Sequence, residues 1–318
     1  MQVLATSVAL SAAGPRKARR PLAGLKAVTF RSVRELLQEC TAATHAGLAA
    51  ALRECSLVGV VDRHLTLIQH GTRMLLIHHT QFARELFYQQ ALRLFSNAAP
   101  FPLAPPLEVG EAVALALAAH GLGAPGERPG IVAQVCALLA GKAALLCEYF
   151  GIELRGGEEE GEGEGKGEGM GGQQAHPPQP LRLHALPRLL DAHTPQLHYL
   201  PDFLLQLAYD VSWEVEVECF RGIAQCLASF YAHPPAIPLR VMAAAAAPTA
   251  AAGEGGGAEG VALTEAFRLV PESVHVLVAQ VLLPGIKAGL LPPRTLTHGQ
   301  HVIQVASTEK LYTVFERC

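Results

Sequence analysis

Aromatic and charged side chains are scarce in this sequence of 318 residues, at 6% and 17% of the total. Hydrophobic residues make up 50% of it, which excludes an intrinsically disordered chain and is typical of one large or two modest globular domains. The seven cysteines are odd in number and never form a Cys-x-x-Cys spacing. This pattern disfavours a disulfide-stapled secreted protein and favours a reducing compartment.

Long hydrophobic runs are missing as well. Lys142 interrupts one candidate stretch, and Gln280 and Pro284 interrupt the other, so we expect no membrane span. Near the start, small apolar residues precede a basic run at 16–20, which is the reverse of a secretory signal. We therefore expect residues 1–29 to form a disordered linker or leader, with a transit peptide or a weak nuclear signal as alternatives.

A strong excess of charge of either sign is also absent. The 25 basic and 28 acidic residues give a net charge of −3, and much of the excess lies in a Gly- and Glu-rich run at 158–168. The remainder is nearly neutral and has no basic footprint for DNA, so any contact with DNA should be local or come through a partner.

Catalytic motifs are lacking too. The sequence has no Gly-x-Ser-x-Gly and no His-Glu-x-x-His, and Gly121-x-Gly123-x-x-Gly126 follows a predicted helix instead of a strand. His64, His70 and the pair His78-His79 lie close together in sequence, but no acidic or thiol ligand stands beside them at a known zinc spacing. Ordinary turn or surface histidines explain the group better than a metal site does.

Periodic segments cover most of the remaining chain. Three short β-rich runs, Leu57–Val61, Leu65–Gln69 and Met74–Ile77, are separated by residues that suit hairpin turns. Apolar spacing predicts helices at 31–54, 80–96, 108–119, 131–150, 201–209, 213–231 and 271–290, then a strand at 302–306 and a short helix at 308–316. Because strands and helices do not alternate, we predict an α+β fold. Two low-complexity segments, at about 156–180 and 243–260, are predicted to be disordered loops.

Three groups of segments match one protein family in the same order. They are Leu57–Val61 through Gln69–Thr72 to Glu85–Gln89; Leu189–Asp191 through Val211–Trp213 to Phe230–Tyr231; and Leu291–Pro293 with the ending Leu311–Cys318. The chain thereby resembles the C-terminal region of eukaryotic MutL homolog 1 over roughly residues 30–318. The ending Phe-Glu-Arg-Cys is the most specific part, because a motif and a chain end must coincide.

The resemblance implies an α+β module with two parts. One is a small mixed or antiparallel sheet with helices that pairs with another subunit, and the other is a helical outer lobe. Full-length relatives also carry an N-terminal GHKL-type ATPase and a long linker, and neither occurs in this sequence. ATP binding is therefore not expected of these residues, which would be a fragment, a split gene product or a chain with a mispredicted start.

By the same resemblance, the chain would act in DNA mismatch repair in the nucleus. It would be a non-catalytic subunit that forms a heterodimer with a PMS-type MutL paralogue and supports the endonuclease of that partner. It would also recruit repair factors that carry short peptide motifs, such as a repair exonuclease, and it would contact DNA only indirectly. Rival hypotheses are a stand-alone metal-dependent nuclease that uses the histidine cluster and Glu85, or a degenerate fragment that no longer dimerises.

The PMS-type relatives bind their metal with Asp-Gln-His-Ala-x-x-Glu-x-x-x-x-Glu. In this chain the three acidic positions of that motif are His78, Arg84 and Gln89. Hard divalent cations require oxygen ligands, and a histidine and an arginine do not supply them. We therefore expect no enzyme activity and no cofactor bound by this chain alone.

Site residues follow from the resemblance. We expect the dimer interface to include Leu36, Leu37, Leu311, Tyr312 and Phe315, with the alternative that they fill the core of the protomer itself. The terminal cysteine of the family reaches toward the metal site of the partner, which implies that Cys318 shares a zinc ion with that subunit. A thiolate is a good zinc ligand, so the chemistry is consistent with this role.

Overall fold

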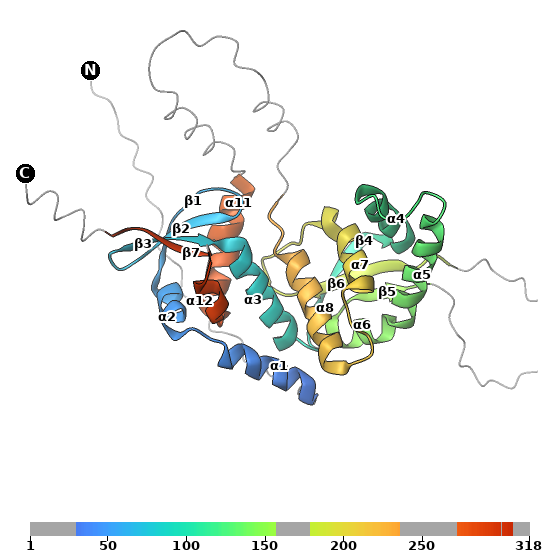
Figure 1. Cartoon of the computed structure of the whole chain (residues 1–318), viewed down its shortest axis with the longest axis horizontal. Helices are drawn as coiled ribbons and strands as arrows, with labels where there is room; N and C mark the ends of the chain where they lie inside the picture. Colours follow the sequence, from blue (N-terminus) through green and yellow to red (C-terminus); the bar gives the residue numbers. More distant parts are fainter. Residues whose placement is uncertain (1–29, 157–178, 236–271, 300, 308–318) are drawn as a thin grey trace, which may run out of the picture.

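The computed structural model describes residues 30–156, 179–235, 272–299 and 301–307. The linker expected at 1–29, the helix expected at 308–316, the loop at 243–260 and most of the loop at 156–180 lie outside the described residues. Within the described part the chain has the predicted α+β fold, with two antiparallel sheets in two lobes (Figure 1).

The first lobe contains a four-stranded sheet in the order β1-β2-β3-β7; the sequence predicts the four strands but not their order. Its strands are β1 (Ser56–Val60), β2 (Leu65–His70), β3 (Arg73–His78) and β7 (Val302–Ser307). The helices around it are α2 (Ala46–Glu54), α3 (His79–Arg93), α11 (Glu272–Val276) and α12 (Leu283–Gly289). Strand β7 joins the sheet beside β3 although more than two hundred residues separate them in sequence.

The second lobe contains a three-stranded sheet, in the order β4-β6-β5, that the sequence analysis did not predict. Its strands are β4 (Ala99–Glu108), β5 (Glu153–Arg155) and β6 (Arg182–Arg188), and its helices are α4 (Val109–Ala119), α5 (Arg128–Gly141), α6 (Ala143–Phe150), α7 (Leu200–Tyr209) and α8 (Glu216–Tyr231). Strand β4 contains four prolines, which argue against a central strand, and it lies at an edge where they are tolerated. The outer lobe is therefore mixed rather than purely helical.

Helices α3 and α8 join the two lobes, and one continuous hydrophobic core runs through both. Helix α1 (Arg31–Ala42) packs against α3 and α8 along the lower edge in Figure 1. At its start, the ring of Phe30 meets Phe95, Tyr149 and Phe220 edge-on, with ring centroids 5.1–5.7 Å apart. These contacts hold the start of α1 against the outer lobe.

Three predicted helices are interrupted in the structure. The segment 31–54 breaks at 43–45, where the His45 ring accepts a hydrogen bond from the backbone of Leu48 and begins α2. The segment 131–150 breaks at Lys142, and the segment 271–290 passes through a π-helical turn before Pro284 opens α12. Proline lacks the backbone N–H, so it fits the first turn of a helix better than its interior.

Among the described helices, no single one is long and apolar enough to cross a membrane. By length and composition alone, α5 and α6 together would suffice, but they are bent by 54° where they meet.

Candidate functional site

The two faces of the first sheet differ in how far they are covered. In β2 and β3 the side chains alternate, so that Thr66, Ile68, Leu75 and Ile77 are buried on the face toward the helices. The opposite face carries residues that remain partly or fully exposed. Most are apolar (Leu65, Leu67, Met74, Leu76 and Ile303), and Gln69 and His78 lie on the same face opposite Met74 and Leu65. We call this second set the outward sheet face.

Cross-strand pairing makes the outward sheet face continuous. Leu67 lies opposite Leu76, and Leu76 lies opposite Ile303, so apolar side chains span three adjacent strands. On the two edge strands, Val58 is 48% exposed and Val305 is 53% exposed. An antiparallel sheet with one face in water normally carries polar residues on that face, so this apolar face has the composition of a surface that a second protein covers.

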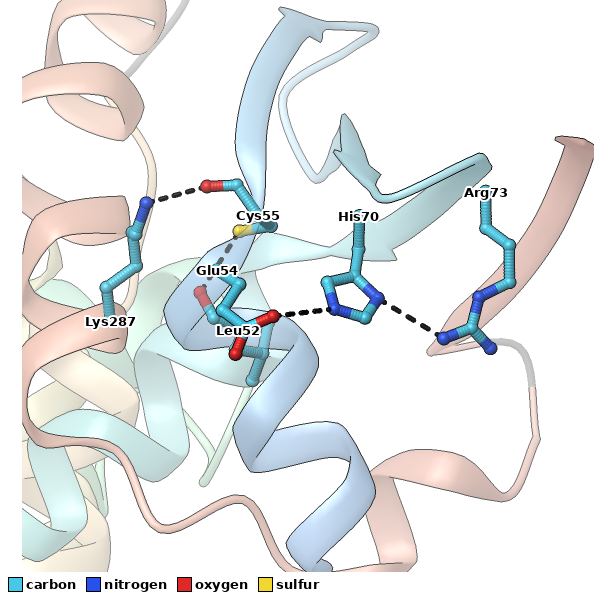
Figure 2. A network of polar contacts seen from close by, with 6 residues as sticks. All are labelled: Leu52, Glu54, Cys55, His70, Arg73 and Lys287. Carbon is cyan, nitrogen blue, oxygen red and sulfur yellow. Dashed lines mark hydrogen bonds and ion pairs between the residues drawn. The ribbon is translucent and has the colours of Figure 1, made fainter. Parts of the chain in front are cut away.

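A polar network holds the β2–β3 hairpin and its supporting helices in place (Figure 2). The Arg73 guanidinium donates to Nδ1 of His70 over 3.2 Å, and Nε2 of His70 lies 3.4 Å from the Glu54 carboxylate. Because a guanidinium only donates, Nδ1 must accept and the ring proton sits on Nε2. On the other side of α2, the Lys287 ammonium donates to the Cys55 carbonyl over 2.6 Å, which joins α12 to the end of α2.

His78, at the first acidic position of the endonuclease motif, ends β3. Its ring centroid lies 5.7 Å from that of His64 and 6.0 Å from that of His301. Its Nδ1 atom is buried without a hydrogen-bond partner. Burial lowers the pKa of His78, and the neighbouring His64 ring lowers it further, so the ring is neutral near pH 7.

Gln89, at the third acidic position, is fully buried and uses its whole hydrogen-bonding capacity. Its amide nitrogen donates to the Glu85 carboxylate (2.8 Å) and to the Leu291 carbonyl (2.7 Å). Its amide oxygen accepts from Arg93 and from the Leu291 N–H, both at 3.0 Å. A glutamate here would lose both donors, so this position has a structural role that an acidic ligand could not fill.

The second position, Arg84, is exposed on α3 and forms no hydrogen bond or salt bridge with another described residue. The adjacent Glu85 is half-buried, and desolvation raises the pKa of its carboxyl group. Across the described part of the chain, no group of three or more His, Cys, Asp or Glu residues is placed to hold a metal ion.

The predicted interface residues fall into two groups. Leu36 has no exposed surface and fills the core of the protomer, and Leu37 packs against that core. Both lie on α1, which contacts α3 and α8, so they stand apart from the outward sheet face. Leu311, Tyr312, Phe315 and Cys318 lie outside the described residues. The interface role of Leu36, Leu37, Leu311, Tyr312 and Phe315 and the zinc-ligand role of Cys318 stay predictions.

Sequence reasoning missed the residues of the outward sheet face. A signal was present, because the runs Leu65–His70 and Arg73–His78 carry apolar residues at both odd and even positions. A strand that is apolar on both faces is covered on both faces. The network around Gln89 had no such signal, since its partner Leu291 is 202 positions away.

The chain has clear relatives among known proteins. Residues 29–318 match the family described as DNA mismatch repair protein Mlh1 C-terminus. The sequence is 29% identical over 308 residues to DNA mismatch repair protein Mlh1 of Dictyostelium discoideum. The aligned region covers 96% of this chain and 31% of that relative. It is 28% identical over 297 residues to DNA mismatch repair protein MLH1 of Saccharomyces cerevisiae. The aligned region covers 92% of this chain and 34% of that relative. The chain thus spans about a third of the length of the curated relatives it matches.

Proposed function

Because the chain belongs to the family of DNA mismatch repair protein Mlh1 C-termini, we propose that it is a dimerisation module in DNA mismatch repair. In this proposal it is a non-catalytic subunit that pairs with a PMS-type MutL paralogue and supports the endonuclease of that partner in the nucleus. Repair factors would be recruited by the assembled subunits, and DNA would be contacted mainly through the partner.

The outward sheet face is the observation that carries this proposal. Its leucines, Met74 and Ile303 form an apolar surface across three strands of one sheet. Buried apolar surface is the main favourable term in protein association, and a flat sheet face needs no rearrangement to provide it. We therefore propose that the dimer interface lies there, and Leu311, Tyr312 and Phe315 stay predicted members of it.

The replaced motif supports the non-catalytic role. His78 is neutral and offers nitrogen, Arg84 is a cation, and Gln89 is fully engaged in the protein's own hydrogen bonds. These three residues do not form an oxygen-rich site for Mg²⁺ or Mn²⁺. We propose that this chain contributes only the thiolate of Cys318 to a zinc ion held mainly by the partner.

The interface can be tested with two matched valines. Val305, on β7, and Val215, in the outer lobe, are 53% and 52% exposed. Mixed with a PMS-type C-terminal region, the chain with Val305→Asp should lose affinity by more than about tenfold, because truncated or charged interface anchors cost on the order of 2 kcal/mol. Val215→Asp should bind as the unchanged chain does. Size-exclusion chromatography with light scattering measures both.

Equal affinity for the two variants would place the interface elsewhere. Failure of the unchanged chain to form a heterodimer would instead favour the degenerate fragment. Nicking of supercoiled DNA by the isolated chain with Mn²⁺ would favour the stand-alone nuclease. Within the heterodimer, Cys318→Ser should lower zinc content and nicking while leaving dimerisation intact.

A further inference from the structure

A polar cavity lies between α1, α3 and α8. Its volume is about 560 Å³, and Pro293, Thr295, Leu296 and His301 line one side of it. A second hollow of about 170 Å³, lined by residues of α7 and α8, shares both Arg84 and Gln225 with the first. The two hollows therefore adjoin at Arg84 and Gln225, and we refer to them together as the groove.

The charged side chains that line the groove differ in whether they already have a hydrogen-bond partner. Arg221 donates to both oxygens of Glu39, at 2.7 and 3.2 Å, so this pair is saturated. Glu85 already accepts a hydrogen bond from Gln89, and its burial raises its pKa. Arg84 makes no comparable contact within the described residues. It is the cation that the groove leaves available.

The neutral groups around Arg84 also have free hydrogen-bonding capacity. The Tyr88 hydroxyl and the amides of Gln81 and Gln225 line the cavity and make no hydrogen bond to any described residue. On the far side, Nδ1 of His301 is buried without a partner. Side-chain amides bind both the N–H and the C=O of a peptide backbone, and a guanidinium binds a carboxylate. The guanidinium of Arg84 only donates, whereas the hydroxyl and the amides can both donate and accept, so the set suits a peptide backbone that carries a carboxylate.

We propose that this groove binds an extended peptide segment whose acidic side chain pairs with Arg84. Gln81 and Gln225 would hold the peptide backbone, and the exposed Asp210 at the far end would accept a backbone N–H. The inference rests on the proposed recruitment of repair factors but not on heterodimer formation. It also assigns a function to Arg84, which occupies the position where the PMS-type motif has an acidic metal ligand.

A nucleic acid fits the groove less well. Glu39, Glu85 and Asp210 line it together with only two arginines, one of which is saturated. A polyanionic backbone needs several free cations to displace its counterions, and this groove provides one. A single carboxylate among backbone amides matches the available groups.

The test uses the full chain and three short, capped, fluorescent peptides that differ only in a central glutamate, glutamine or lysine. Fluorescence anisotropy should show the glutamate peptide binding about fivefold more tightly than the glutamine peptide, as expected for one partly screened ion pair. The lysine peptide should bind most weakly. A single-stranded oligonucleotide serves as the competing ligand.

Variants then assign the preference to the groove. Arg84→Gln should abolish the difference between the glutamate and glutamine peptides, and Arg84→Lys should retain part of it. Arg53→Gln, an equally exposed helical arginine outside the groove, should leave the preference intact. Gln225→Ala should weaken both peptides alike, because it removes a backbone contact and no charge. Circular dichroism checks that each variant is folded.

Several results would overturn the proposal. These are no measurable binding of any peptide, tighter binding of the lysine peptide, or an equal loss of preference in Arg53→Gln. Oligonucleotide binding that depends on Arg84 would make the groove a nucleic-acid site instead. Heterodimer formation is measured separately with the Val305 variant. A negative peptide-binding result therefore does not contradict the proposed dimerisation, and a negative dimerisation result does not contradict the proposed peptide site.

Discussion

The two sheets of this protein are covered to different degrees. In the outer lobe, the central strand β6 is buried at most positions, including Leu183, Ala185 and Leu186. In the first lobe, β2 and β3 are buried at alternate positions, and the other positions carry apolar side chains that remain partly exposed. The sheet of the outer lobe is largely buried, whereas the sheet of the first lobe has an apolar face that the other described residues leave partly exposed.

This difference separates two kinds of apolar residue that look alike in sequence. A leucine in β6 contributes to the stability of the isolated chain, because folding removes it from water. A leucine on the outward sheet face should contribute less to folding and, in the proposed heterodimer, more to association. Mutations in the two sheets should therefore affect different measurements.

The largest expected effect is in the outer lobe. Leu186→Ala should lower the unfolding free energy of the isolated chain by about 2–5 kcal/mol, because it removes a fully buried side chain and leaves a cavity. Leu67→Ala on the outward sheet face should cost clearly less in the same chemical denaturation. If the two variants lose equal stability in the isolated chain, the contrast between the sheets is wrong.

A somewhat smaller loss is expected at the hydrogen-bond network between α3 and the segment after α12. Gln89→Leu should cost about 2–3 kcal/mol, because it leaves the buried N–H and C=O of Leu291 without partners. Gln90→Leu, its partly exposed neighbour on α3, is the matched control and should have little effect. Thermal unfolding of both variants measures the difference, and similar midpoints would contradict this role of Gln89.

Each lobe also contains a buried histidine that titrates abnormally. Burial lowers the pKa of His79 in the first lobe and of His193 in the outer lobe to about 4. Since the unfolded chain binds these protons near pH 6.5, stability should be complete above that pH and should fall as the pH drops toward 4. His193 packs against Phe87 and has no partner for Nδ1.

His193→Phe should remove part of this pH dependence, about 2 kcal/mol at pH 5, because the pKa of His193 is lowered from 6.5 to about 4 by folding. The comparison is the denaturation midpoint at pH 7.5 and pH 5 for the variant and the unchanged chain. An identical slope with pH in both proteins would show that His193 is not the responsible group. His79 contacts the Thr66 hydroxyl at 2.8 Å and should account for part of the remaining slope.

The smallest effect is expected from the connection between β5 and β6. Arg155 lies opposite Arg182 in the sheet, so the two ends of the intervening segment are neighbours. Deleting 158–177 should leave the melting temperature and heterodimer affinity nearly unchanged, because the cost of closing a loop depends only weakly on its length. A large drop in either quantity would contradict the prediction that this segment is dispensable.

Much of the first sheet and most helices could be predicted from the sequence, because alternation and helical spacing are local properties. Strands β1, β2, β3 and β7 lie within a residue or two of their predicted bounds. Strand β4 could not be predicted, since its prolines oppose a strand and only pairing with β6 stabilises it. In the candidate site, the loss of the acidic motif could be read from the sequence. The outward sheet face left a signal in its strands that the sequence analysis did not use, and the groove beside Arg84 left none.

The sequence by itself determined the strand and helix periodicity, the replacement of three acidic ligands by His78, Arg84 and Gln89, and the family through its ordered motifs and Phe-Glu-Arg-Cys ending. Tertiary structure decided what those residues do. It placed Gln89 against Leu291 across 202 positions, left Arg84 facing a groove, and covered only one side of an apolar sheet. The physical reason is range: local patterns specify backbone conformation, whereas burial and hydrogen-bond partners depend on segments that meet only after the chain has folded.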